Sequence, residues 1–219
     1  MFQADLTSGS NNNNFKEDKM KKFMSVLAVL VVAALFVSCA GTTVQRVDAN
    51  TITDLSGRWN DTDAQLVAEQ IVKESLTFPW LVKFVKKTGK EPKVIVGEIR
   101  NKTDEHIDTD VFRKAIEREL LNSGSVEFVA DKNEREEIRG ERADQQEYSS
   151  DSTRKNFKQE EAADYMLKGV ITSVVDQISG KRAIFYQIDM ELFDIESNKK
   201  VFAGQKQIKK LIERPGIGF

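Results

Sequence analysis

A short apolar run that ends at the chain's single cysteine limits what the first forty residues can become. Residues 20–41 are MKKFMSVLAVLVVAALFVSCAG, and the apolar part, residues 23–37, is fifteen residues long. A helix that crosses a membrane needs about 20 apolar residues, whereas the core of a secretory signal peptide needs only about 7–15. We therefore expect residues 20–38 to be a signal peptide and exclude them from the fold.

The residues around Cys39 indicate that this cysteine is lipidated. Small side chains flank it, as a signal peptidase requires for access to the backbone, and the motif resembles a bacterial lipobox. Phe36 is bulkier than the leucine usual at that position. Cys39 would become the first residue of the mature protein, and its acyl chains would make membrane lipid a partner. An uncleaved N-terminal anchor and a signal peptide cut elsewhere are the alternatives.

Composition divides the rest of the chain. Residues 1–19 form a polar, asparagine-rich tail that has nothing to bury; we expect it to be disordered or to come from an over-extended reading frame that truly starts at Met20. Residues 39–60 lack a helical period, which indicates a lipidated tether. Residues 61–212 suffice for one domain with a sizeable core, followed by a C-terminal tail at 213–219.

Charge and cysteine content exclude several classes of protein. Residues 39–219 carry 29 lysines and arginines against 32 aspartates and glutamates. Without a basic excess there is little to displace counterions from phosphates, so we expect no nucleic-acid partner. Because the one cysteine is committed to lipid, neither an intrachain disulfide nor a thiolate metal cluster can form.

The first part of the expected domain is helical. Asn60 or Thr62 can cap the first helix, and Thr62 with Gln65 has the spacing of a capping box. One narrow stripe repeats at helical spacing and consists of Ala64, Val67, Ala68, Ile71 and Ser75. Aromatic and aliphatic residues between Pro79 and Pro92 predict a second, short helix on the core.

Strands dominate the remainder of the domain. Residues 93–100 are β-branched and apolar on both faces, which predicts a central strand, and a helix capped by Asp108 or Thr109 should end at Gly124. The remaining expected elements are a strand at 126–130, a helix from Asp131, a helix at 152–163, and strands at 165–175, 183–193 and 200–208. The order β-α-β-α-α-β-β-β, preceded by an N-terminal helical segment, predicts an α/β (α+β) single domain. Its sheet is mixed, partly antiparallel and flanked by helices.

Several segments together resemble one family of bacterial lipoproteins. They are RVDAN (46–50), DLSGRWNDTD (54–63), GEIRNKTDEHIDT (97–109), NEREEIRGERADQQ (133–146), KGVITSVVDQ (168–177) and FYQIDMELFDIESNKKVFAGQKQIKK (185–210). In this order they are similar to the penicillin-binding protein activator LpoB family. The resemblance implies a fold related to curli-secretion lipoproteins and to the N-terminal domain of TolB. It also implies an outer-membrane lipoprotein whose periplasm-facing domain binds and stimulates a peptidoglycan synthase, a class A penicillin-binding protein.

Catalytic chemistry is not indicated anywhere in the chain. The only histidine, His106, lies in a polar loop without a serine elbow or a second histidine. Its acidic neighbours lack the glycine and the closing glutamate of a calcium-binding EF-hand loop. We expect no enzymatic activity, no metal, no cofactor and no small-molecule substrate.

Two features are candidate partner-binding surfaces. Arg58 and Trp59 stand where the tether ends, and such residues are enriched at the centres of interfaces, although Trp59 can equally staple the helix start to the core. The segment 133–147 has scarcely any core face, which is typical of a solvated helix or of one available to a partner. Its candidate residues are Arg135, Arg139, Arg142, Gln145 and Gln146.

The function classes left open differ in partner. The leading hypothesis is a regulatory adaptor of a synthase, and the alternative is an envelope assembly or secretion accessory lipoprotein of the curli-secretion-like type. The tether constrains both, because about 21 residues after Cys39 span at most roughly 70–75 Å when extended and about 25 Å as a coil. We expect the partner either to reach up from the inner membrane or to lie close to the outer membrane.

Overall fold

The computed structural model describes residues 19–27, 44–48 and 51–213. The chain forms two units, Met1–Ala49 and Asn50–Phe219. In the first unit residues 19–27 are helical, and among the described residues no helix is both long and apolar enough to cross a membrane. Cys39, most of the expected signal peptide and the tail at 1–18 lie outside the described residues.

Two helices open the second unit. Helix α2, Asp61–Thr77, is capped by Asn60, whose side chain accepts the N–H of Asp63 while the Asp63 carboxylate accepts the N–H of Asn60. The capping box is therefore two residues earlier than the expected pairing of Thr62 with Gln65, because Asn60 already satisfies a free N–H group of the first turn. Helix α3, Pro79–Thr88, lies between Pro79 and Pro92 as predicted, and it ends at Gly89, whose φ is 69°.

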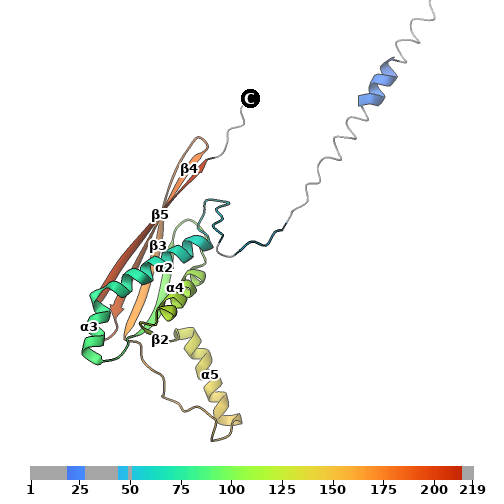
Figure 1. Ribbon diagram of the computed structural model, residues 1–219. Helices are drawn as coiled ribbons and strands as arrows, with labels where there is room; N and C mark the ends of the chain where they lie inside the picture. The colour runs from blue at the N-terminus through green and yellow to red at the C-terminus, as the bar shows by residue number, and fades with distance from the viewer. Residues whose placement is uncertain (1–18, 28–43, 49–50, 214–219) are drawn as a thin grey trace, which may run out of the picture. The chain divides into compact units, whose positions relative to one another are not determined.

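The sheet has five strands in the order β2-β1-β3-β4-β5 (Figure 1). Their bounds are β1 Lys93–Lys102, β2 Glu127–Phe128, β3 Tyr165–Ile178, β4 Lys181–Asp194 and β5 Lys200–Glu213. Strand β1 is parallel to β2 and β3, whereas β3, β4 and β5 are antiparallel, so the sheet is mixed as expected. The remaining helices are α4, Thr109–Ser123, and α5, Lys132–Tyr148.

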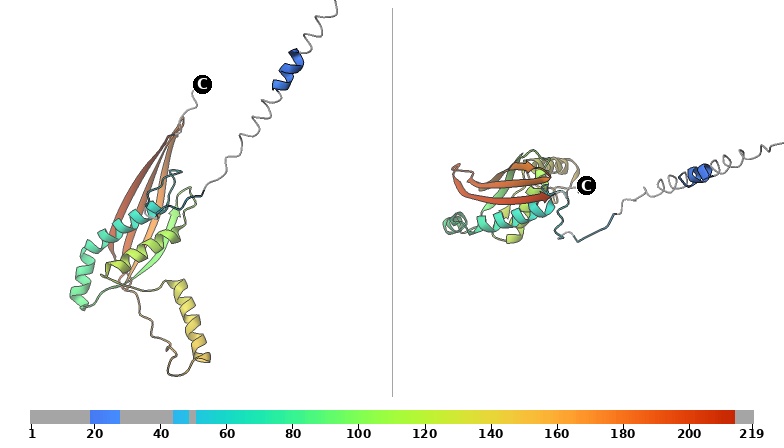
Figure 2. Two further views of the ribbon diagram at one scale, coloured as in Figure 1. Left: turned by 45° about the vertical axis from the view of Figure 1, so that its right-hand side comes forward. Right: turned by 90° about the horizontal axis from the view of Figure 1, so that it is seen from above.

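One face of the sheet forms the core. Helices α2 and α4 lie on it side by side (Figure 2), and alternate residues of β4 pack beneath them with 0–2% of their surface exposed. These are Ile184, Tyr186, Ile188, Met190 and Leu192, the set that alternation predicts. Every fully buried core residue of the described chain lies between Ala64 and Phe202, so a chain that starts at Asn50 retains the complete core.

Two expected elements are wrong or shortened. Residues 152–163 form turns and extended chain instead of a helix, and Lys158 has a left-handed φ of 60°. The reason is that Phe157, the one large apolar side chain there, is 52% exposed, and a helix this short needs a buried face to be stable. The strand expected at 126–130 is reduced to Glu127–Phe128. The order from β1 onwards is therefore β-α-β-α-β-β-β.

Candidate partner-binding site

Helix α5 and the chain that returns from it, residues 131–163, form an arm that we call the α5 arm. No residue of α5 is buried, and Figure 1 shows the helix standing apart from the sheet. Its start is fixed to α4 by ion pairs: Arg113 Nη1 lies 2.7 Å from Asp131 Oδ2, and Lys114 Nζ lies 2.5 Å from Glu134 Oε1. Charge, and not apolar packing, therefore positions the arm.

The same two carboxylates also form the capping box of α5. Asp131 accepts the N–H of Glu134 and Glu134 accepts the N–H of Asp131. Partial burial acts to raise the pKa of Asp131, but the N–H of Glu134 and the Arg113 guanidinium outweigh it and hold that pKa below its usual range. The bond from Lys114 does the same for the pKa of Glu134. Both groups are therefore ionised at neutral pH, and the attachment stays intact.

Two arginines of α5 hold the returning chain. Arg139 Nη2 lies 2.7 Å from one carboxylate oxygen of Glu160, and Arg142 Nη1 lies 2.9 Å from the other. The two guanidinium groups lower the pKa of Glu160 to about 2. Both candidate residues are thus engaged within the arm, although the side chain of Arg139 remains 53% exposed.

The other three candidate residues of α5 also have intramolecular partners. Gln145 Oε1 accepts the N–H of Lys155, and Gln146 Nε2 donates to the carbonyl of the same residue at 2.7 Å. Arg135 Nη1 donates to the carbonyl of Ala130 at 3.1 Å. The glutamines thus connect α5 to the returning chain of the arm. Arg135 also faces a hollow between α5 and the sheet.

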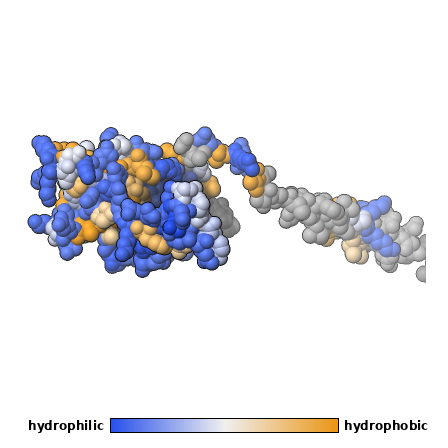
Figure 3. Space-filling view, turned by 90° about the horizontal axis from the view of Figure 1, so that it is seen from below, coloured by the Kyte–Doolittle hydropathy of each residue, from blue (hydrophilic) through white to orange (hydrophobic). Residues whose placement is uncertain are grey.

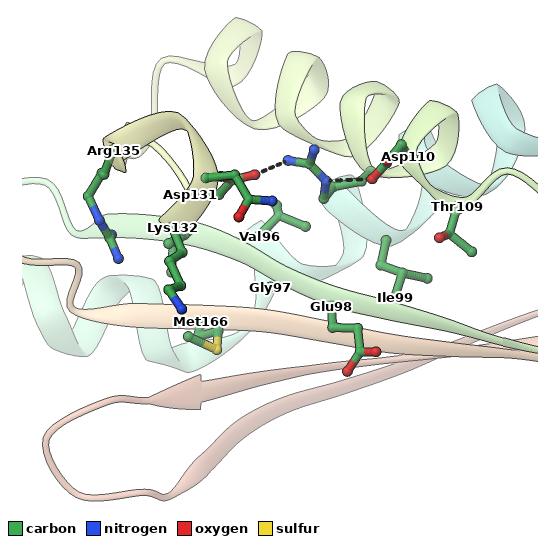
Figure 4. Close-up of a pocket in the computed structure, with 13 residues that line it drawn as sticks. Val96, Gly97, Glu98, Ile99, Thr109, Asp110, Asp131, Lys132, Arg135 and Met166 are labelled. Carbon is green, nitrogen blue, oxygen red and sulfur yellow. Dashed lines mark hydrogen bonds and ion pairs between the residues drawn. The ribbon is translucent and has the colours of Figure 1, made fainter. Parts of the chain in front are cut away.

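That hollow is one of two that adjoin each other beside α5, and we call the pair the α5 groove. The first has a volume of about 510 Å³ and lies between β1 and the starts of α4 and α5. Figure 4 shows Lys132 and Arg135 extending from α5 toward the strand that carries Met166. The second, of about 460 Å³, is lined by the returning chain and shares three residues with the first, namely Ile95, Arg135 and Met166.

The groove exists because β2 is so short. Strand β2 pairs with β1 only at Lys93 and Val94, so in the described part of the chain the rest of this edge of β1 carries no neighbouring strand. Its floor is apolar, with Ile95 only 6% exposed, and cations of α5 line its wall. An exposed strand edge with adjacent side-chain pockets is the arrangement that binds an extended peptide by strand addition.

Arg58 and Trp59 are adjacent in sequence but lie in different environments. The Trp59 ring packs edge-on against Phe112 and Tyr186, with ring centroids 5.9 and 5.8 Å apart, and the backbone N–H of Trp59 donates to the Tyr186 hydroxyl. Trp59 therefore covers the core, while Arg58 is exposed and its carbonyl accepts a hydrogen bond from Lys210 Nζ at 3.0 Å. Contact of either residue with a partner stays a prediction.

Sequence reasoning missed the groove and one buried ion pair. The groove depends on the length of β2, which the run at 126–130 overstated. Lys210 Nζ lies 2.6 Å from Asp63 Oδ2, and both side chains are nearly buried. The available signal was position: Lys210 shares the inward face of β5 with Phe202 and Ile208, where an unpaired cation would be unfavourable. Among the described residues, no cluster of three or more His, Cys, Asp or Glu side chains could hold a metal ion.

A family model described as "Peptidoglycan-synthase activator LpoB" matches residues 63–208, about two thirds of the chain. The chain belongs to the LpoB family. The matched range contains the α5 arm and the α5 groove, whereas Cys39, Arg58 and Trp59 precede it. No curated protein sequence matches the chain.

Solved structures of LpoB are similar but distant. The LpoB C-terminal domain from Escherichia coli is 14% identical, with 69% of this chain and 99% of that chain covered and a TM-score of 0.36. The NMR structure of E. coli LpoB is 12% identical, with 80% and 83% covered and a TM-score of 0.38. Lipoprotein GNA1162 from Neisseria meningitidis is 10% identical, with 55% and 83% covered and a TM-score of 0.36. At TM-scores this low, membership of the LpoB family depends on the family model and not on these likenesses.

Proposed function

We propose that this chain is a lipid-anchored, periplasm-facing adaptor of the outer membrane. It binds and stimulates a peptidoglycan synthase, a class A penicillin-binding protein, and has no catalytic activity of its own. The observation that carries the proposal is the match of residues 63–208 to a family described as peptidoglycan-synthase activators. An activator acts by binding, so the site that needs explaining is a docking surface.

We place the synthase contact at the α5 groove. The groove offers an apolar floor, an open strand edge and the cations Lys132 and Arg135. Most carboxylates that line the groove have a cationic partner, because Asp110 and Asp131 bind Arg113 and Glu160 binds arginines of the arm. In the first hollow the remaining carboxylate is Glu98, and against it stand Arg135 and Lys132, the latter also 3.9 Å from Glu136. This balance favours an extended segment of the synthase that carries acidic and apolar side chains, because opposite charges would steer it and main-chain bonds would hold it.

Charge reversal in the groove tests this placement. Lys132→Glu with Arg135→Glu should weaken binding of the purified synthase and reduce its stimulation, by about tenfold or more if both cations face acidic groups. Lys83→Glu with Lys86→Glu, on exposed positions of α3, changes the net charge equally and is the matched control. Thermal melts of both variants should match the wild type. Equal losses in the two variants would exclude the groove as the contact, and a wild-type chain that binds no class A synthase would refute the proposed function.

The anchor at Cys39 is the second part of the proposal. Neither Ala40 nor Gly41 is an aspartate of the kind that retains lipoproteins in the inner membrane, so outer-membrane sorting is expected. Two or more acyl chains hold a protein stably, since each buried methylene contributes about 0.8 kcal/mol. A Cys39→Ser chain should be unprocessed or soluble. Its recovery in the outer-membrane fraction at the wild-type level would contradict this assignment.

Lengthening the tether tests whether its reach limits contact with the synthase. A proline-rich spacer inserted after Thr43 should improve synthase stimulation in cells if reach is limiting, because a coil of this length spans only about 25 Å. Unchanged activity, together with in-cell crosslinks to the synthase, would show that the native tether suffices. Co-purification of secretion-channel subunits in place of a synthase would favour the alternative, an envelope assembly accessory lipoprotein.

A further inference from the structure

The tether joins the domain at one end of the sheet. Asp54 Oδ1 accepts a bond of 2.6 Å from Lys210 Nζ, and Gly57, at φ 67°, lies so close to Ile212 that a Cβ there would be 2.3 Å from its Cγ1. We call this region the tether end; it comprises residues 54–58, 174–183 and 209–213. Fourteen residues separate Asp54 from Cys39, so the chain between them spans about 20 Å as a coil.

Large apolar side chains are exposed at the tether end. Strands β3 to β5 run beyond α2 here (Figure 1), so no helix covers the side chains at this end of the three strands. The exposed fractions are 66% for Val174, 72% for Ile178, 67% for Leu211 and 93% for Leu55. Phe185 pairs with Val174 across the hairpin, which makes part of this surface continuous. Viewed from below, the opposite end is largely hydrophilic, with apolar patches among the polar residues (Figure 3).

The tether end also contains a basic hollow. It has a volume of about 880 Å³, and its charged lining residues are Arg58, Lys181, Arg182 and Glu213. Glu213 pairs with Lys181 at 3.1 Å, whereas in the described part of the chain neither arginine has an ion-pair partner. The Nε of Arg182 is buried and makes no hydrogen bond. A buried donor without an acceptor is unfavourable, and an anionic oxygen that enters the hollow would satisfy it.

We propose that the tether end docks on the membrane surface that holds the acylated Cys39. The exposed apolar side chains enter the lipid interface, and Arg58, Lys181 and Arg182 bind the phosphate groups of anionic phospholipids. Apolar residues flanked by cations are what an interfacial lipid surface selects, and the short tether keeps this end of the domain near that surface. The inference uses the proposed function only for the anchor at Cys39. It leaves the opposite end of the domain, with the α5 arm, facing a partner.

Vesicle sedimentation tests the charged half of the inference. The chain 50–219, which retains the complete core but has no acyl group, should bind vesicles of phosphatidylethanolamine with phosphatidylglycerol and not vesicles of phosphatidylcholine. Lys181→Gln with Arg182→Gln should weaken binding about fivefold per cation, the ratio that corresponds to the roughly 1 kcal/mol each basic side chain contributes at an anionic surface. Lys83→Gln with Lys86→Gln on α3 is the matched control and should bind as the wild type does.

A second pair of variants tests the apolar half. Val174→Ser with Leu211→Ser should weaken vesicle binding about tenfold or more. Val111→Ser with Leu121→Ser removes the same two side-chain types from exposed positions of α4, 54% and 56% exposed, and should leave binding unchanged. The Tm of both double variants should match that of the wild type, since all four positions are exposed.

Three results would overturn the inference. The first is absence of binding, or equal loss of binding in variants and controls. The second is complete displacement by excess inorganic phosphate, which would assign the hollow to a free anion. The third is intact vesicle binding in the tether-end variants with loss of synthase binding, which would make this end a protein-docking face. The vesicle assay contains no synthase, so its outcome is independent of the proposed function.

Discussion

Replacing Lys210 by methionine should destabilise the domain, because it leaves the buried carboxylate of Asp63 without its cationic partner. Lys210 Nζ lies 2.6 Å from Asp63 Oδ2 and 2.6 Å from Asp54 Oδ1. The side chains of Lys210 and Asp63 are only 9% and 7% exposed, whereas that of Asp54 is 49% exposed. Without the lysine, Asp54 can turn to water. Asp63 cannot, because its carboxylate also caps α2 by accepting the N–H of Asn60.

The size of the effect follows from this asymmetry. Removing one member of a buried ion pair costs about 3–5 kcal/mol. Asp63 keeps its bond from Asn60, so we expect the lower end, about 3 kcal/mol, or a fall in Tm of roughly 6–12 °C for a domain of this size. Asp63→Asn keeps an acceptor for that N–H and leaves Lys210 with Asp54, so about 1–2 kcal/mol is expected. The double variant should lose less than the sum of the two single losses.

Acid should partly restore the Lys210→Met variant. Burial raises the pKa of Asp63 even in the wild type, although bonds from Lys210 and Asn60 act against it. A raised carboxyl pKa means that the folded state binds the proton more tightly than the unfolded state, so the destabilisation declines as pH falls toward and below that pKa. Urea unfolding at pH 7 and near pH 4 measures both effects. A variant as stable as wild type at pH 7, or a deficit independent of pH, would refute the reasoning.

Two further predictions concern the core and the arm. Ile188→Asp or Ile116→Asp, each at a position with 0% exposure, should unfold the domain, because an unpaired buried carboxylate costs several kcal/mol against a total stability of about 5–15 kcal/mol. Glu191→Lys, on the other face of β4, should have only a mild effect on stability. Equal losses of Tm in all three variants would contradict the assignment of Ile188 and Glu191 to opposite faces of the strand. Glu160 should titrate near pH 2 by NMR, so the stabilisation from its bonds to the arm is complete above the ordinary pKa of a glutamate and is lost as pH falls through about 2. Arg139→Gln should raise the pKa of Glu160, and an unchanged titration would argue against the contact.

The sequence indicated the sheet well where one physical effect dominates. Strand β4 alternates apolar and polar residues because only one of its faces is buried, and Ile188 lies on the face that alternation assigns to the core. The caps of α4 and α5, Asp108 and Asp131, were found because side-chain capping is local in sequence. Gly124 likewise ends α4 with a φ of 60°.

Features set by distant residues could not be found in this way. Whether Trp59 faces a partner or the core depends on Phe112 and Tyr186, which are far from it in sequence. The α5 groove depends on where β2 stops pairing with β1, and no local pattern encodes that. The helix predicted at 152–163 is absent because a short segment without an apolar face to bury gains too little from packing to be stable as a helix.

Because the α5 arm is held by charge and buries nothing, it should behave as a separate cooperative unit. Its amide hydrogens should exchange through a local opening that leaves the core intact, whereas those of β4 must await global unfolding. Added salt should speed exchange in α5 and leave β4 unaffected, since screening weakens ion pairs but not apolar packing. Substitutions, insertions or deletions between Asp131 and Ala163 could accumulate at little cost in fold stability. The arm is thus the segment in which such a domain can change its choice of partner while keeping its architecture.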